Sequence, residues 1–154
     1  MDDLLTVAPE WVQLLDDEDL ERLTVLELDA AVADDAPWDG YPVQLAVSVD
    51  LVDPDPQGQP YDDEHAALAL FRLALEQAIG GDGRLVATIT MDGVREHLAY
   101  VRSAATVQRW REHPPEGFAG HDVEVQLFED PGWLGLREVA GSLRQDEQPL
   151  RPPE

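Results

Sequence analysis

Several short stretches of the chain alternate between apolar and polar residues, with the period of two that half-buried β-strands show. The alternation is most regular over 43–51, VQLAVSVDL, where every second residue is Val or Leu. Weaker alternation marks 22–32, the two stretches on either side of Asp92-Gly93, and 122–128. We therefore predict five strands.

The dipeptide Asp92-Gly93 stands between two alternating stretches, and it favours a two-residue hairpin turn. The residues then predicted to face the core are Leu85, Ala87, Ile89 and Met91, opposite Tyr100, Leu98, Glu96 and Val94. The residues predicted to face away from the helices are Thr88, Thr90, Arg95 and His97. A one-residue bulge would reverse this assignment.

Helical periodicity is clearest over 66–79, AALALFRLALEQAI. Acidic residues that suit a first helical turn precede it, and Gly80-Gly81 provides a stop. Its broad apolar stripe indicates a helix that lies flat on the sheet.

Two weaker helices are predicted over 9–19 and 103–113, the second ending before two prolines. The stretch 53–60, DPDPQGQP, has the composition of a surface loop. Residues 129–139 are predicted to form a turn followed by one turn of helix.

From residue 43 onward the predicted order is strand–helix–strand–strand–helix–strand, the βαββαβ arrangement of a ferredoxin-like sandwich. We therefore expect an α+β fold with one added N-terminal strand. Two helices would cover one face of an antiparallel sheet and leave the other face for solvent or a partner. The predicted organisation is an N-terminal helical arm (1–19), a single α+β domain (20–140) and a flexible C-terminal tail (141–154).

Charge is the outlying property of the composition. The 154 residues include 33 acidic and 10 basic ones, a net charge of −23, and every basic residue is Arg. Such a surface repels nucleic acid and anionic membranes, so neither is expected as a direct partner. Either the chain is an acidic decoy for the basic groove of a nuclease or nucleic-acid-binding protein, or a GC-rich genome, salt-adapted or not, produces the bias. The scatter of the acids in short runs favours the second explanation.

The absence of cysteine excludes a disulfide framework and thiolate metal ligands. No run of 18 apolar residues indicates a membrane span, and the N-terminus lacks the basic region of a signal peptide. A soluble cytoplasmic protein is expected.

The succession of segments resembles the domain-of-unknown-function family 695 over about 20–140. The hairpin ATITMDGVREHLAYVRS and the later EDPGW carry most of the resemblance. The residues that match the family's motifs are Thr88, Thr90, Gly93, Arg95, Glu96, His97, Tyr100, Asp130, Pro131 and Trp133. His97 and Leu98 depart from the aromatic-rich strand that is usual there. The resemblance implies no established activity; more distantly, the family is similar to a bacterial inhibitor of ribonuclease E, regulator of ribonuclease activity B.

The sequence assembles no catalytic set. It contains four His, but no HExxH motif, nucleophile elbow or phosphate loop. We therefore expect no catalytic residue, metal or cofactor, and predict a non-enzymatic module that binds a protein through its open sheet face or acidic surface. The candidate binding residues are Thr88, Thr90, Arg95 and His97. The alternatives are an acidic inhibitor of a basic nuclease and, from another class, a small metal-dependent hydrolase that uses carboxylates and His97.

Overall fold

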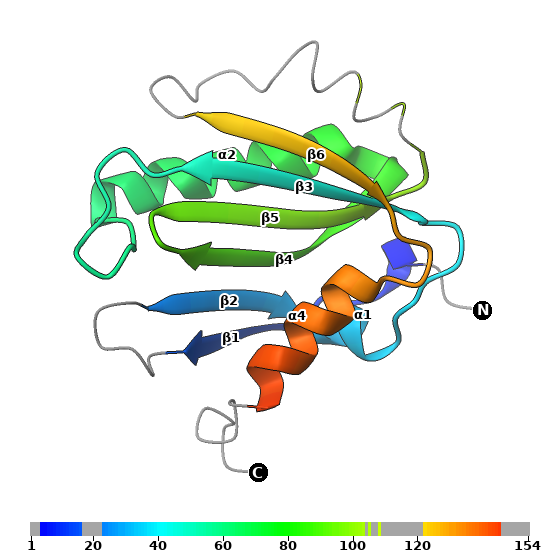
Figure 1. The fold of residues 1–154 in the computed structure, drawn as a ribbon. Coiled ribbons are helices and arrows are strands. Elements are labelled where there is room, and N and C mark those ends of the chain that lie inside the picture. Colours follow the sequence, from blue (N-terminus) through cyan, green and yellow to red (C-terminus); the bar gives the residue numbers. More distant parts are fainter. Residues whose placement is uncertain (1–3, 17–22, 104, 106–107, 109–121, 146–154) are drawn as a thin grey trace.

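The computed structural model describes residues 4–16, 23–103, 105, 108 and 122–145. Its centre is one six-stranded antiparallel sheet with the spatial order β1-β2-β4-β5-β3-β6 (Figure 1). The strands are β1 (Trp11–Asp16), β2 (Thr24–Asp29), β3 (Val43–Asp50), β4 (Gly83–Met91), β5 (Val94–Val101) and β6 (Val123–Glu129). The helices are α1 (Ala30–Asp34), α2 (Asp62–Ile79) and α4 (Leu134–Gln145), with short 3-10 turns η1 (Leu4–Thr6) and η2 (Gly80–Asp82).

The two long helices lie on opposite faces of the sheet, with α4 in front and α2 behind in Figure 1. Buried residues of α2, among them Leu68, Phe71 and Leu75, pack on β3 and β5. Leu136 and Ala140 of α4 belong to a second core, built on β1, β2, β4 and β5 with Ala46 of β3. The prediction that helices cover only one face of the sheet is therefore wrong, because each face buries a hydrophobic core.

The ferredoxin-like arrangement stays a prediction. The strands at 43–51 and 122–128, the hairpin and the long helix are confirmed. The sequence predicts the second helix of the βαββαβ unit over 103–113, and most of this range lies outside the described residues.

The N-terminal helical arm is corrected to a strand. Residues 11–16 form β1, paired with β2 from Trp11↔Asp29 to Asp16↔Thr24. Leu14 is buried in the core on the α4 side, while Trp11 and Leu15 are partly exposed on the other side. The five residues WVQLL fit both the helical and the strand period. Their pairing with β2 makes them a strand.

The hairpin turn is confirmed, with positive φ angles of 53° at Asp92 and 79° at Gly93. The predicted register also holds from Met91↔Val94 to Ala87↔Leu98. A bulge between Leu85 and Ala87 then shifts it, so that Leu85 pairs with Ala99 and not with Tyr100. Leu85 consequently packs in the α2 core, whereas Ala87 packs in the α4 core.

The C-terminal helix is longer than predicted. It continues for 12 residues to Gln145, so residues 141–145 belong to α4 and not to a tail. Leu136 of this helix and Trp133, just before it, are fully buried.

Within the described residues, no helix combines the length and the apolar character needed to span a membrane.

Candidate functional site

The four predicted binding residues do meet on one side of the hairpin, but beneath α2 and not in solvent. Thr88 and His97 are each 1% exposed, and Thr90 and Arg95 are also buried. The Thr88 Oγ1 and His97 Nδ1 atoms lie 2.8 Å apart, and Arg95 Nε donates to Thr90 Oγ1 over 2.9 Å. The expectation that these side chains face away from the helices is wrong, because hydrogen bonds between them allow a polar layer to be buried.

His97 is enclosed between the sheet and α2. Its ring centroid is 5.8 Å from that of Phe71 on α2, and its Nε2 atom has no hydrogen-bond partner among the described residues. Burial lowers its pKa from 6.5 to about 3, and the positive charges of Arg95 and Arg72 act in the same direction. The imidazole is therefore neutral at physiological pH and closed to any substrate.

A network of charges borders this buried layer. Arg72 of α2 pairs with Glu27 of β2 at 2.9 Å and with Glu76 at 3.2 Å, and its guanidinium lies 4.3 Å from the centre of the Trp11 ring. Burial lowers the pKa of Arg95, while the nearby carboxylate of Glu27 opposes that effect. These contacts tie α2 to the β1–β2 half of the sheet.

Three of the family-motif residues form one structural unit at the start of α4. The rings of Tyr100 and Trp133 stack with centroids 3.9 Å apart, and the Tyr100 hydroxyl donates to Asp130 Oδ2 over 2.8 Å. Asp130 also accepts the backbone N–H groups of Leu134 and Gly135, which caps the helix.

The titration of this unit follows from its contacts. Burial, and then the hydrogen bond to Asp130, raises the pKa of Tyr100. Partial burial favours a neutral Asp130, but its hydrogen bonds from Gly135, Tyr100 and Leu134 outweigh it and lower the pKa. The Asp130 carboxylate thus joins Tyr100 to the start of α4. This structural role accounts for the three motif residues without a ligand.

The remaining motif residues lie in the hairpin turn, in the turn before α4 and on β5. Gly93 supplies the left-handed turn conformation, and Pro131 lies exposed in the turn before α4. Glu96 of β5 is half-buried on the α4 face, where it accepts a hydrogen bond from Ser48 of β3 over 3.2 Å.

Glu96 lies on a part of the sheet that no described helix covers. Helix α4 packs with a core on β1, β2, β4 and β5, and no described helix lies in front of β3 and β6 (Figure 1). Residues on this side alternate with the Val and Leu residues that pack under α2. We call this surface the open half-face; it consists of Ser48, Glu96, Glu124, Gln126 and Phe128.

A buried ion pair between Asp29 and Arg84 could not be predicted from the sequence. Asp29, at the end of β2, has no solvent exposure and lies 2.7 Å from an Arg84 nitrogen. Arg84 also donates to the carbonyls of Leu4 and Val7, at 2.7 and 2.6 Å. The ion pair thus fastens the N-terminal segment along the sheet. No sequence motif indicates this ion pair, because Asp29 stands in the alternating stretch 22–32 at a position where an exposed acid is expected.

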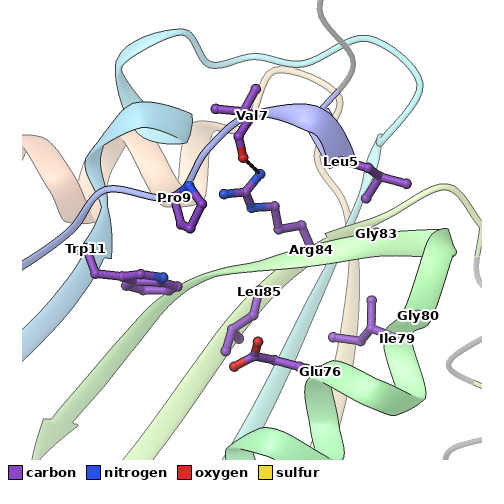
Figure 2. A pocket seen from close by; sticks show the side chains of 10 residues that line it. All are labelled: Leu5, Val7, Pro9, Trp11, Glu76, Ile79, Gly80, Gly83, Arg84 and Leu85. Carbon is purple, nitrogen blue, oxygen red and sulfur yellow. Dashed lines mark hydrogen bonds between the residues drawn. The ribbon is translucent and has the colours of Figure 1, made fainter.

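That segment closes one wall of a pocket of about 310 Å³, drawn in Figure 2. Its lining comes from residues 5–11, the last turn of α2 and the start of β4. Among the described residues, no group of three or more His, Cys, Asp or Glu side chains is placed to hold a metal ion.

Together, the sheet and the opposed helices define an α+β protein in which most of the motif residues are buried. The chain belongs to a family of unknown function, DUF695, whose model matches residues 14–138. This confirms the family indicated by the hairpin and EDPGW motifs. No curated protein and no solved structure matches the chain.

Proposed function

We propose that this protein is a non-enzymatic module that binds a basic protein through its open half-face. The observation that carries the proposal is Phe128, an aromatic residue that is 48% exposed on the open half-face. Glu124 and Gln126 stand beside it on the same strand. Aromatic residues are enriched in protein-binding surfaces, and the rim of such surfaces is polar.

The placement of the arginines supports a basic partner. Arg72, Arg84 and Arg95 are directed into ion pairs and hydrogen bonds within the protein. Their positive charge is therefore used internally in a chain of net charge −23. The exterior is left strongly negative, which attracts a basic partner and repels nucleic acid.

The two contributions have different energetic roles. Carboxylates at the rim of an interface mainly accelerate association, and added salt screens that effect. A half-exposed Phe gains most when a partner removes it from water, so Phe128 is expected to limit dissociation.

An acidic inhibitor of a basic nuclease is the narrower form of this proposal. The similarity in strand order and acidity to the ribonuclease E inhibitor suggests it, and it requires that the captured partner be a nuclease inhibited by stoichiometric binding. The hydrolase alternative gains no support, since His97 is enclosed beneath α2.

The test begins with affinity capture from native cytoplasm at low and high salt, followed by affinity measurements on the captured partner. Glu124→Gln combined with Phe128→Ala should weaken binding by at least about tenfold, or about 1.4 kcal/mol. The matched control combines Glu129→Gln, on the other face of β6, with Leu70→Ala, an exposed apolar residue of α2. The control should bind like the wild type. Equal losses in both variants, or an affinity that salt does not change, would contradict the proposal.

A further inference from the structure

Helix α2 carries a second apolar stripe on the side that is turned away from the sheet. Leu70 and Leu73 are 71% and 54% exposed there, and among the described residues no large apolar side chain is more exposed than Leu70. Ala66 and Gln77 are exposed on the same side, one turn before and one turn after the two leucines. The buried residues of the helix lie on its opposite side. Apolar side chains gathered in this way indicate an interaction surface.

The spacing of the stripe indicates the kind of element that covers it. Ala66, Leu70, Leu73 and Gln77 are four, three and four residues apart, which is the spacing of the seam residues in a coiled coil. Such a narrow stripe packs against one other helix. Alanines stand beside the seam at 69 and 74, and these small side chains allow a second helix to approach closely.

The charges on α2 favour a second helix from another acidic chain. Residues 65–75 contain no Asp or Glu, although the whole chain has a net charge of −23. The one basic residue of this range that is charged at neutral pH, Arg72, is directed to Glu27 and Trp11 and lies off the seam. A basic partner would therefore gain no ion pair at the seam, whereas two copies of this chain can meet there without opposing charges.

We propose that two copies of this protein pair through α2 in an antiparallel dimer with two-fold symmetry. The midpoint of the seam lies between Leu70 and Leu73. A two-fold axis at this point packs each Leu70 on the Leu73 of the other copy. The outer layers then pair Ala66 with Gln77, a small side chain with a larger one.

The acidic start of α2 decides between antiparallel and parallel pairing. Asp63 lies three residues before Ala66 and therefore extends the seam by one layer. In a parallel pair this carboxylate would face the same carboxylate of the other copy, and such like-charge contacts are costly. In the antiparallel pair it lies opposite Gly80, where the helix of the other copy has ended.

The dimer leaves the open half-face uncovered, because Phe128 and α2 lie on opposite faces of the sheet. The inference therefore does not depend on the proposed function. The two also respond to salt in opposite directions. The net charge of −23 on each copy opposes dimerisation, so added salt strengthens the dimer, whereas it weakens the binding of a basic partner. Below its dissociation constant the protein is monomeric, so Leu70→Ala remains a control for partner binding.

The first test is sedimentation equilibrium of the full chain from micromolar to millimolar concentration, at low and at high salt. A seam of four layers is smaller than a standard interface, so the dimer should be weak and reversible. Its association constant should rise at least about threefold with salt. Leu70→Gln should weaken the dimer at least about tenfold, because each dimer loses two leucines. The matched control, Leu134→Gln, removes a leucine of α4 that is 64% exposed and should leave the dimer unchanged. A chain that stays monomeric at both salt concentrations, or equal losses in the two variants, would overturn the proposal.

The second test uses cross-linking to determine the orientation, and it has no background because the chain contains no Cys. A mixture of Ala66→Cys and Gln77→Cys should form a disulfide between copies under mild oxidation. Ala66→Cys alone should not, because the two residues at position 66 lie about 16 Å apart along the axis of the antiparallel pair. Linkage by Ala66→Cys alone, or no linkage in the mixture, would contradict the antiparallel dimer.

Discussion

Acidification should destabilise this protein through His97 in a way that a single substitution can isolate. The ordinary pKa of the imidazole, 6.5, describes the unfolded chain, whereas burial holds the folded value at about 3. Between these two pH values the His97 imidazole is protonated in the unfolded state and neutral in the folded state. The stabilising contribution is therefore complete above pH 6.5, declines as the pH falls below it, and declines no further below about pH 3.

The magnitude follows from the size of that window. Each pH unit inside it costs about 1.4 kcal/mol, so moving from pH 8 to pH 5 removes about 2 kcal/mol through His97 alone. A final pH of 5 keeps the protein above its pI of about 4.1, where it still carries a net negative charge. The many carboxylates add their own pH dependence, which is common to the wild type and its variants.

The assay is urea unfolding at both pH values for the wild type, His97→Phe and His65→Phe. In His97→Phe the loss of unfolding free energy from pH 8 to pH 5 should be smaller than in the wild type by about 2 kcal/mol. His65 is exposed at the start of α2, so its replacement should leave the wild-type loss unchanged. If His97→Phe lost as much stability as the wild type, the imidazole would not be enclosed in the folded state.

Three further substitutions test the packing by urea unfolding. Thr88→Val should cost about 2 kcal/mol, because it removes the hydrogen-bond partner of a buried imidazole; a loss below about 0.5 kcal/mol would place this residue in solvent. Gly83→Ala should cost about 3 kcal/mol, because an added Cβ would overlap the Tyr100 carbonyl, while Gly81→Ala has open space and should change little. Asp130→Ala should cost about 2 kcal/mol through loss of the α4 cap, with reduced helix content by circular dichroism, and retention of both would contradict the capping role.

Local patterns were sufficient for the elements whose signals are long or specific. The regular alternation of 43–51 becomes β3, the helical run ends at Gly80, and Asp92-Gly93 forms the predicted turn. The residues opposite each other near that turn could therefore be named correctly from the sequence.

The side of the hairpin that faces solvent could not be obtained in this way. Alternation shows two faces but not how many of them are covered, and the polar face here holds a hydrogen-bonded layer under α2. One signal was present, since HLAYV at 97–101 is a nearly continuous apolar run and all five residues are buried. Such runs are typical of strands covered on both faces.

The other errors come from interactions over long sequence separations. Asp29 is buried because Arg84, 55 residues later, pairs with it, and β1 is a strand because β2 lies beside it. The pocket lining likewise joins the N-terminal segment to α2 and β4. No local pattern contains these contacts.

The open half-face can be tested directly by fluorine NMR on protein labelled with 4-fluorophenylalanine, in which Phe128→Leu assigns the signal. Addition of the captured basic partner should shift the Phe128 resonance and leave that of Phe71, buried between α2 and the sheet, in place. A partner that binds fully while the Phe128 resonance stays unmoved would show that this surface is not where the protein acts.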